Sequence, residues 1–389
     1  MDVWNFIRKL SRFAERHNFQ GYDPYDALNS PIVRLLSFNN KYLRIAWLQF
    51  LRRLPVNIRP LLLIQPGHNP KALALFLAGY VRLQKIDPSR GHLDKINTLF
   101  ELLRKNISQG YSGSCWGYNF DWQNRAFWLP KYTPTVVNTA FAGHALLDAW
   151  FSLGEQRFLD LAVSTKDFLL KDLNRTYDGD TFCFSYTPLD NTTVHNANLL
   201  GASLLIRLFH ITGDGELRQC ATQSLAYSMK RQNPDGSWYY ADTEFQRWID
   251  SFHTGFNLEA IRHFLALGEA EQFRLAYEKG VRFYAKHFFL EDGTPKYYHN
   301  RVYPIDIHAP AQAIAFFSAE GKQYQKLTDK ILSWMCRNMW DERGFFYFRK
   351  GRFITNKIPY MRWSQAWCFR ALTCYIFHRR TGELAEEEN

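Results

Sequence analysis

The sequence predicts an all-α fold, an (α/α)6 barrel in which six helical hairpins form a toroid and short aromatic β-hairpins lie in the loops. Apolar helical segments that begin with polar residues recur along the chain, and amphipathic helical segments separate them. The spacing is nearly constant: Asn138 and Asn196 are 58 positions apart, and His253, His308 and Trp363 follow at intervals of 55. A period of this size indicates a repeat architecture.

The segments predicted to be inner helices share a polar start and a helical pattern rich in Ala, Leu and Phe. They begin near residues 69, 134, 193, 250, 306 and 362. Segments 93–107, 155–173 and 214–232 carry apolar residues at helical spacing with polar residues between them, so we expect outer helices there. The last hairpin ends near Arg380 and must pair with the N-terminal region to close the ring.

Glycine turns separate the predicted hairpins. Segments 177–186, 234–242, 291–299 and 341–348 each place Asp-Gly or Arg-Gly before an aromatic run. Glycine supplies the positive φ of a tight turn, and aromatic residues favour strands, so each segment predicts a turn with a short strand.

These patterns divide the chain into three parts. We expect the barrel over residues 65–380 and a disordered acidic tail over 381–389. Residues 1–64 form a basic amphipathic segment that packs on the barrel or on a membrane. Within it, 31–64 interleaves Arg and Lys with Leu, Ile and Trp. Packing on the barrel, with Arg stems covering apolar surface, is the favoured interpretation, and a membrane interface is the alternative.

Composition limits the function classes. With 389 residues, 46% of them hydrophobic, the chain has enough apolar residues for a large core. The net charge of +11 favours anionic partners such as acidic polysaccharides or anionic lipids. Nucleic acid is not expected, because the basic residues form no long run and no recognisable motif. Six cysteines without a CxxC pair indicate buried, reduced thiols.

The expected location is the cytoplasm, with the periphery of the inner membrane as the alternative. The first residues lack the apolar core of a signal peptide, and no stretch is long enough to span a bilayer.

Inner helices of such a barrel run parallel, so their polar N-terminal caps share one mouth. Helix N-termini carry partial positive charge and free N–H groups, and convergent polar groups in a concave site predict a ligand pocket. The candidate catalytic residues are His195, His253, Tyr360, Arg362, Asp250, Asp306 and His308. The candidate substrate-binding residues are Trp116, Tyr118, Asp121, Trp122, Asn138, Asn196, Asn198, Trp238, Trp363 and Gln365.

The hairpin pattern resembles the α/α six-hairpin barrels, which include six-hairpin glycosidases, toroidal polysaccharide lyases, glucuronyl C5-epimerases and sugar 2-epimerases. The combination of WGYNFDWQ, PTVVNTAFAGHALLD, VHNANLLGA, DGSW and WIDSFHTGF resembles a bacterial family found in exopolysaccharide and O-antigen biosynthesis loci. This resemblance implies the barrel fold and a role in surface-polysaccharide production, and it leaves the reaction open. KRQNPDGSW also resembles the Gln-Trp motif of terpene cyclases, but a DxDD acid motif is lacking.

Lyase or epimerase chemistry on a uronate-containing glycan is the first functional hypothesis. Arg362 suits neutralisation of the uronate carboxylate, because its planar fork matches a carboxylate. His195 or His253 suits the role of base, and Tyr360 that of acid. This chemistry requires no cofactor. A metal site through His253, His308 and Asp306 is not predicted, because HExxH-like spacing is lacking.

Two alternatives stay open. A glycoside hydrolase needs two carboxyl groups flanking the scissile bond, for which Asp250 and Asp306 are the candidates, with Asp121 and Glu259 behind them. Ordinary helix capping explains Asp250 and Asp306 equally well. A non-catalytic glycan-binding or assembly subunit would use the tryptophans of the same loops as stacking platforms.

Overall fold

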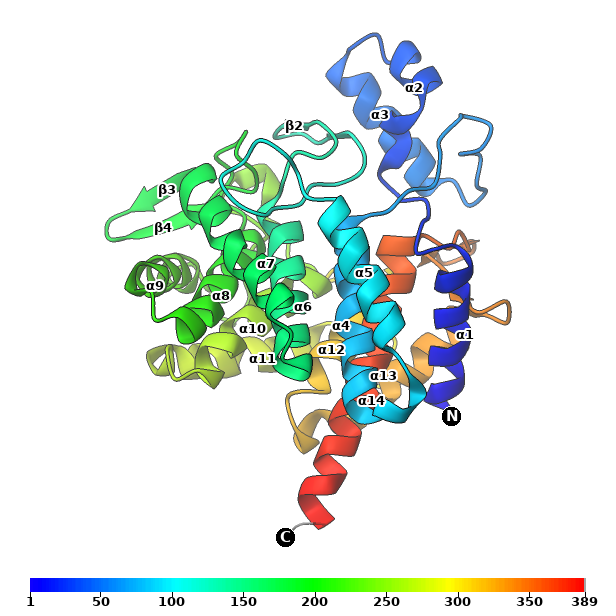
Figure 1. Cartoon of the computed structure of the whole chain (residues 1–389). Coiled ribbons are helices and arrows are strands. Elements are labelled where there is room, and N and C mark those ends of the chain that lie inside the picture. Colours follow the sequence, from blue (N-terminus) through cyan, green and yellow to red (C-terminus); the bar gives the residue numbers. More distant parts are fainter. Residues whose placement is uncertain (388–389) are drawn as a thin grey trace.

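Six inner helices form a closed ring in the computed structural model, which describes residues 1–387. They are α4 (Pro70–Ile86), α6 (Val136–Leu153), α8 (His195–Thr212), α10 (Ser251–Ala266), α12 (His308–Phe317) and α14 (Trp367–Glu387). Each contacts the next, and α14 returns to α4, which confirms the predicted (α/α)6 barrel. The C-terminal end of α14 extends from one end of the barrel, and α2 and α3 lie beyond the other (Figure 1).

A second layer of helices surrounds this ring. It consists of α5 (Leu93–Lys105), α7 (Gln156–Asp167), α9 (Gly215–Met229), α11 (Arg274–His287), α13 (Gln325–Asn338) and α1 (Val3–Arg16). Helix α1 packs against α14, so the N-terminus of the chain completes the last hairpin. Its Glu15 accepts a hydrogen bond from the Tyr80 hydroxyl of α4 at 2.7 Å.

The outer helices bury one face, whereas the inner helices are buried on nearly all sides, as their sequences predict. In α5 the buried residues Ile96, Leu99, Phe100 and Leu103 lie on one face, whereas nearly every residue of α4 is buried. Inner helices approach closely where side chains are small. A Cβ on Gly79 would lie 2.5 Å from the Phe369 ring, so glycine lets α4 pack directly against α14.

Short antiparallel strands lie in the loops, as predicted. β1 (Trp122–Gln123) pairs with β2 (Trp128–Leu129), β3 (Arg175–Asp178) with β4 (Thr181–Phe184), and β6 (Trp340–Asp341) with β7 (Phe345–Phe346). β8 (Arg349–Lys350) lies between β5 (Ile305–Asp306) and β9 (Thr355–Asn356).

Two of the four predicted glycine-turn strands, 234–242 and 291–299, are irregular loops instead. Their backbone groups bond the starts of inner helices. The Tyr240 carbonyl accepts from the His195 amide at 3.1 Å, and the Tyr297 carbonyl accepts from the Ser251 amide at 2.9 Å. These carbonyls therefore fix the loops onto the helix caps.

Residues 22–64, here called the lobe, pack beside the mouth of the barrel. The lobe contains η1 (Asp26–Asn29), α2 (Pro31–Leu36) and α3 (Lys41–Arg53). It has a small core of its own, built from Ala27, Leu28, Val33, Leu48, Leu51 and Ile64. The first 64 residues thus contribute both an outer helix of the barrel and this lobe.

At the other end of the chain, α14 continues as far as Glu387. Residues 381–387 of the acidic tail are therefore helical, and 388–389 lie outside the described residues. No helix within residues 1–387 combines the length and apolarity needed to cross a bilayer. All six cysteines are buried and unpaired.

Candidate active site

A cavity of about 530 Å³ lies at the N-terminal ends of the inner helices. Inner-helix segments, the loops between hairpins and α3 of the lobe all contribute to its wall. The wall residues used below are Gln49, Arg52, Arg53, Lys71, Tyr118, Trp122, Arg125, Tyr186, Asn196, Tyr240, Trp248, His253, Tyr297, Tyr298, His308, Arg362 and Trp363. The predicted common mouth therefore exists, and α3 forms one side of it.

The lining of this cavity is basic and aromatic. Its five cationic side chains are Arg52, Arg53, Lys71, Arg125 and Arg362. No Asp or Glu occurs among the described residues that line it. A concave site of one charge sign concentrates ligands of the opposite sign, and aromatic faces suit the apolar faces of sugar rings. The cavity is therefore suited to an anionic ligand.

His253 and Asp250 form a hydrogen-bonded pair at the start of α10. The Asp250 carboxylate caps the helix by accepting from the His253 amide at 3.1 Å, and it also accepts from His253 Nδ1–H at 2.6 Å. Trp248 Nε1 donates to the same carboxylate at 3.0 Å. The Asp250 side chain is fully buried, whereas the His253 ring is 21% exposed.

This pair fixes the tautomer of His253. With Nδ1 protonated toward Asp250, Nε2 of the neutral ring carries the lone pair and is the basic atom. The Tyr240 and Phe252 rings lie 4.7 and 4.3 Å from the imidazole, measured between ring centroids, and hold it in place. The same short segment is thus both a helix cap and a candidate acid–base group.

Lys71 is a buried amine that sequence reasoning missed. It follows Pro70 in the first turn of α4, and its Nζ lies 4.2, 4.9 and 5.1 Å from the ring centroids of Phe141, Phe256 and Trp367. Within residues 1–387 no carboxylate pairs with this Nζ. Burial, with Arg362 and Arg370 nearby, lowers the pKa of Lys71 well below its usual value. A lysine in the first turn of α4, directly before the apolar run 72–81, was the signal for this site.

His308 lies in the cavity wall with its ring stacked on Phe252, 4.3 Å between centroids. Neither ring nitrogen has a hydrogen-bond partner. Burial lowers the pKa of His308 well below its usual value, and the charges of Lys71 and Arg362 act in the same direction. The ring is therefore neutral, and its two nitrogens are buried in the cavity wall without a hydrogen-bond partner.

Arg362 lines the cavity but already binds a carboxylate. Its Nε and Nη2 donate to the two oxygens of Asp23 at 2.6 and 2.8 Å. This bidentate pair is buried and joins the last hairpin to the lobe. Arg362 is therefore not free to bind a substrate carboxylate, because the carboxylate of Asp23, far away in the sequence, already occupies its guanidinium group.

Arg52 is a free alternative to Arg362. It comes from α3 and lies over the Tyr25 ring at 5.1 Å. Its Nε is buried without a hydrogen-bond partner. Sequence reasoning did not select Arg52, because nothing local indicates that the lobe reaches the barrel mouth.

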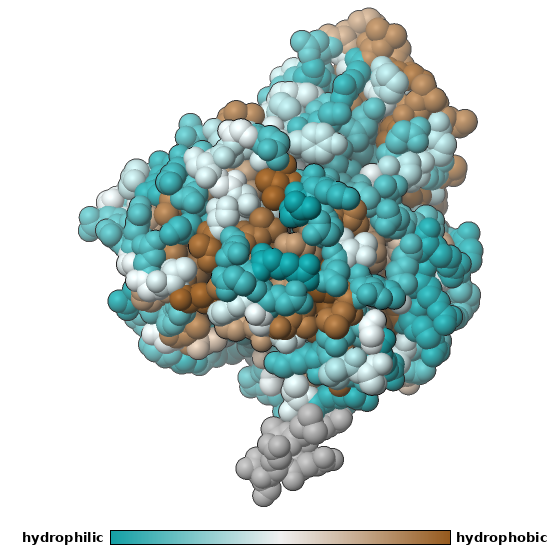
Figure 2. Space-filling model, in the orientation of Figure 1, coloured by the Kyte–Doolittle hydropathy of each residue, from teal (hydrophilic) through white to brown (hydrophobic). Residues whose placement is uncertain are grey.

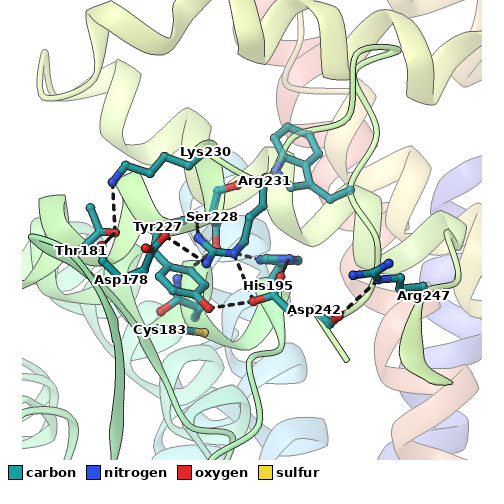
Figure 3. A network of polar contacts seen from close by, with 12 residues as sticks. Asp178, Thr181, Cys183, His195, Tyr227, Ser228, Lys230, Arg231, Asp242 and Arg247 are labelled. Carbon is teal, nitrogen blue, oxygen red and sulfur yellow. Dashed lines mark hydrogen bonds and ion pairs between the residues drawn. The ribbon is translucent and has the colours of Figure 1, made fainter. Parts of the chain in front are cut away.

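His195 does not line the main cavity, contrary to the expectation for a base. It is the first residue of α8 and is 1% exposed. Its Nδ1 lies 3.2 Å from Ser228 Oγ and its Nε2 lies 3.1 Å from Asp242. Asp242 also accepts from Tyr227 and pairs with Arg231 (Figure 3). The ring is held in this network between α8 and α9, which directs it away from the cavity.

Asp306 and Tyr360 are also absent from the residues that line the cavity. Asp306 accepts from Trp363 Nε1 at 2.7 Å, from the His308 amide at 3.1 Å and from Arg349 at 2.7 Å, so its carboxylate holds three segments together. Tyr360 is fully buried, and its hydroxyl has no partner. Burial raises its pKa further above the usual value, so it stays protonated and out of reach.

Four of the predicted substrate-binding residues line the main cavity: Tyr118, Trp122, Asn196 and Trp363. The buried Asn196 Oδ1 has no hydrogen-bond partner. The other six lie outside its wall: Trp116, Asp121, Asn138, Asn198, Trp238 and Gln365. The side chains of most of these residues form hydrogen bonds or ion pairs with other groups of the protein. Gln365, for example, bonds both the amide and the carbonyl of Phe346 at 2.8 Å.

Glu259, the deeper hydrolase candidate, belongs to a second cavity of about 620 Å³ that is lined by α4, α6, α8, α10 and Arg370 of α14. There it pairs with Arg370 and accepts from Gln312 at 3.0 Å. Burial alone would raise the pKa of Glu259, but Arg370 and Arg262 hold it well below the usual range. Glu259 is therefore an ionised partner of arginine in a separate cavity.

No known family model and no curated protein matches the chain in sequence. Solved structures match in fold. The Lin0763 protein from Listeria innocua has a TM-score of 0.65 at 13% identity and covers 98% of this chain and 99% of its own. A GH76 α-mannanase from Bacteroides thetaiotaomicron has a TM-score of 0.64 at 13% identity, covering 82% and 88%. Cellobiose 2-epimerase from Bacillus thermoamylovorans has a TM-score of 0.62 at 12% identity, covering 80% and 88%. These matches establish the six-hairpin fold relationship.

Proposed function

We propose that this protein is a carbohydrate-processing enzyme that moves protons at a carbon of an anionic sugar, in epimerase or lyase chemistry on a uronate-containing glycan. One observation carries the proposal. The cavity at the mouth of the barrel combines a basic lining free of Asp and Glu, among the described residues, with a histidine supported by a buried carboxylate. The resemblance in fold to an epimerase and a mannanase supports a carbohydrate substrate.

The proposed base is His253. Its Nε2 would take the proton next to the uronate carboxylate, and Asp250 would stabilise the imidazolium that forms. Removing this proton leaves negative charge on the carboxylate side of the sugar, which Arg52 would neutralise in place of the occupied Arg362. The electron pair of the broken C–H bond then either takes up a new proton or expels the neighbouring glycosidic oxygen.

Lys71 is the proposed second acid–base group. Burial and the neighbouring arginines lower the pKa of Lys71 well below its usual value, so this amine gives up its proton more readily than an ordinary lysine does. Protonation of the opposite face of the sugar by Lys71 would complete an epimerisation. Donation to the leaving oxygen would complete an elimination. The tyrosines of the wall serve as hydrogen-bond donors, because burial raises the pKa of Tyr118, Tyr186 and Tyr240.

The hydrolase alternative finds less support. Hydrolysis in most glycosidase families needs two carboxyl groups flanking the bond. Asp250 is buried behind His253, and Asp306 is occupied by three donors. A binding subunit would have no need of a histidine whose tautomer is fixed by a carboxylate, so the pair also favours catalysis over binding alone.

We further propose a role in the production of a bacterial surface polysaccharide, on the cytoplasmic side. The motif resemblance supports the pathway. Six buried cysteines without a disulfide are typical of a reducing compartment.

The test is to incubate the protein with uronate-containing glycans in heavy water. Epimerisation would place deuterium at C5, and elimination would produce an unsaturated sugar that absorbs near the ultraviolet edge. New reducing ends without deuterium would make the protein a hydrolase. Binding of the glycan without any of these products would make it a binding subunit. Either result would replace this proposal.

A further inference from the structure

The lobe exposes an unusual number of large apolar side chains. Leu35, Phe38, Tyr42 and Leu61 are 73 to 78% exposed, and Phe50 and Leu63 are about half exposed. We call these six residues the apolar face. Figure 2 shows hydrophobic surface gathered over this upper part of the molecule, where α2 and α3 lie. Exposed apolar groups that gather in one region mark an interaction site rather than ordinary surface.

Helix α3 has two apolar sides, and the protein covers only one of them. Leu48 and Leu51 point into the core of the lobe. On the other side Tyr42, Ala46 and Phe50, four residues apart, are all exposed. Residues at this spacing lie along one face of a helix. The exposed stripe is therefore a second apolar helix face that has no partner within the described residues.

From Ala27 onward, every charged residue of the lobe is basic. From Ala27 to Ile86 the sequence contains no Asp and no Glu, whereas residues 27–64 hold six Arg and Lys. Lys41 and Arg53 are exposed at the two ends of α3. An amphipathic helix with aromatic and aliphatic residues on one face and basic residues beside it is typical of binding to an anionic membrane surface.

We propose that the lobe docks on an anionic lipid bilayer, with the apolar face inserted at the boundary between headgroups and acyl chains. Lys41 and Arg53, which are exposed and have no carboxylate partner among the described residues, match anionic headgroups, whereas Arg34 and Arg59 pair with Asp121 and Asp26. The same helix supplies Gln49, Arg52 and Arg53 to the cavity wall, so docking would place the cavity mouth next to the membrane. If the function proposed above is correct, the substrate is then an anionic glycan carried on a membrane lipid.

The test is co-sedimentation of the full-length protein with vesicles. The protein should bind vesicles that contain phosphatidylglycerol and bind pure phosphatidylcholine vesicles far less, with binding that weakens as salt rises. The double variant Phe38→Ser/Leu61→Ser should lose at least tenfold in binding. Arg53→Gln should lose about fivefold, the loss expected for one basic residue near the surface.

A matched control is Leu275→Ser on α11, where Leu275 is 78% exposed but isolated from the lobe. It should bind vesicles like the unmodified protein, and thermal melts should show that all variants fold. The proposal is overturned if the unmodified protein does not bind the anionic vesicles, or if Phe38→Ser/Leu61→Ser binds them equally well. It is also overturned if the double variant instead dissociates a dimer seen by analytical ultracentrifugation, because the apolar face is then a contact between copies.

The deuterium assay with a soluble glycan separates this proposal from the enzymatic one. Deuterium exchange without vesicle binding would overturn the membrane proposal alone. Vesicle binding without any reaction would overturn the enzymatic proposal alone.

Discussion

The Nδ1–H of His253 points at a fully buried carboxylate oxygen of Asp250, 2.6 Å away, while the rest of the imidazole stays in the cavity wall. The two residues are three positions apart, across the first turn of α10. One carboxylate therefore caps the helix and sets the tautomer of the histidine. This arrangement leads to the first prediction.

Replacing His253 with Ala should lower the rate of deuterium exchange into a uronate glycan by at least about 100-fold, because general base catalysis contributes that much or more. Asp250→Asn should also lower the rate, since an amide does not hold the imidazole in the required tautomer. The exchange rate by NMR or mass spectrometry is the measurement, with circular dichroism to verify the fold.

His195→Gln is the matched control for His253→Ala. His195 sits in the network of Ser228 and Asp242, so its replacement should lower Tm and leave the exchange rate within a few-fold. Loss of exchange in His195→Gln combined with full activity in His253→Ala would reverse the assignment.

Lys71→Met should abolish exchange and at the same time raise Tm. The lowered pKa of Lys71 means that the folded state binds its proton less tightly than the unfolded state, so the burial of this amine costs stability at neutral pH. Methionine has a similar shape and no charge. We expect a rise in Tm of roughly 2 °C or more by calorimetry.

Lys326→Met on the exposed surface of α13 is the control, and it should change neither Tm nor exchange. A Tm for Lys71→Met below that of the unmodified protein would show that the amine has a partner that stabilises its charge.

Acid should destabilise the protein through His144. Arg207 donates to its Nδ1 at 2.9 Å, so Nε2 carries the proton toward Ser203 Oγ, 3.0 Å away. Burial, together with Arg207, lowers the pKa of His144 to about 3. Between an unfolded pKa of about 6.5 and this value, the unfolded state binds a proton that the folded state lacks. The free energy of unfolding therefore falls as pH decreases below about 6.5.

His144→Gln should reduce the slope of this pH dependence by up to about 1.4 kcal/mol per pH unit, the value for one proton. Urea unfolding between pH 7 and pH 5 measures the slope. His17→Gln, a change of an exposed histidine on the surface near α1, should leave the slope as it is. Equal slopes in both variants would mean that other groups cause the acid sensitivity.

Breaking the buried pair of Asp23 and Arg362 should destabilise the protein strongly. Asp23→Asn leaves the guanidinium without its counter-charge, which costs about 3–5 kcal/mol in other buried pairs. The double variant Asp23→Leu/Arg362→Met should recover part of this loss, because no unpaired charge remains. Denaturant titrations of the single and double variants measure the coupling.

The exposed pair of Glu101 and Arg104 on α5 is the comparison, and Glu101→Gln should cost far less stability than Asp23→Asn, because solvent screens this pair. Similar losses for the buried and the exposed pair would show that Asp23 and Arg362 are not coupled in solution.

The sequence by itself determined the barrel, the short strands of some loops and the common mouth of the inner helices. These depend on periodic patterns: a repeat of nearly constant length, helical spacing of apolar residues, and polar caps at equivalent positions. Parallel inner helices then bring the caps together wherever the exact helix ends fall. His253, His308 and Asn196 lie in the cavity wall for this reason.

Only the tertiary structure decided which cap side chains reach the cavity. His195 and His308 are both the first residue of an inner helix. The His195 ring points to Asp242, which lies in the loop after α9. The His308 ring has no such partner and lies in the cavity wall. Arg362 is occupied by Asp23, 339 positions away. Lys71 has an unusual environment because three other helices surround it. Such contacts between distant segments leave no periodic trace in the sequence.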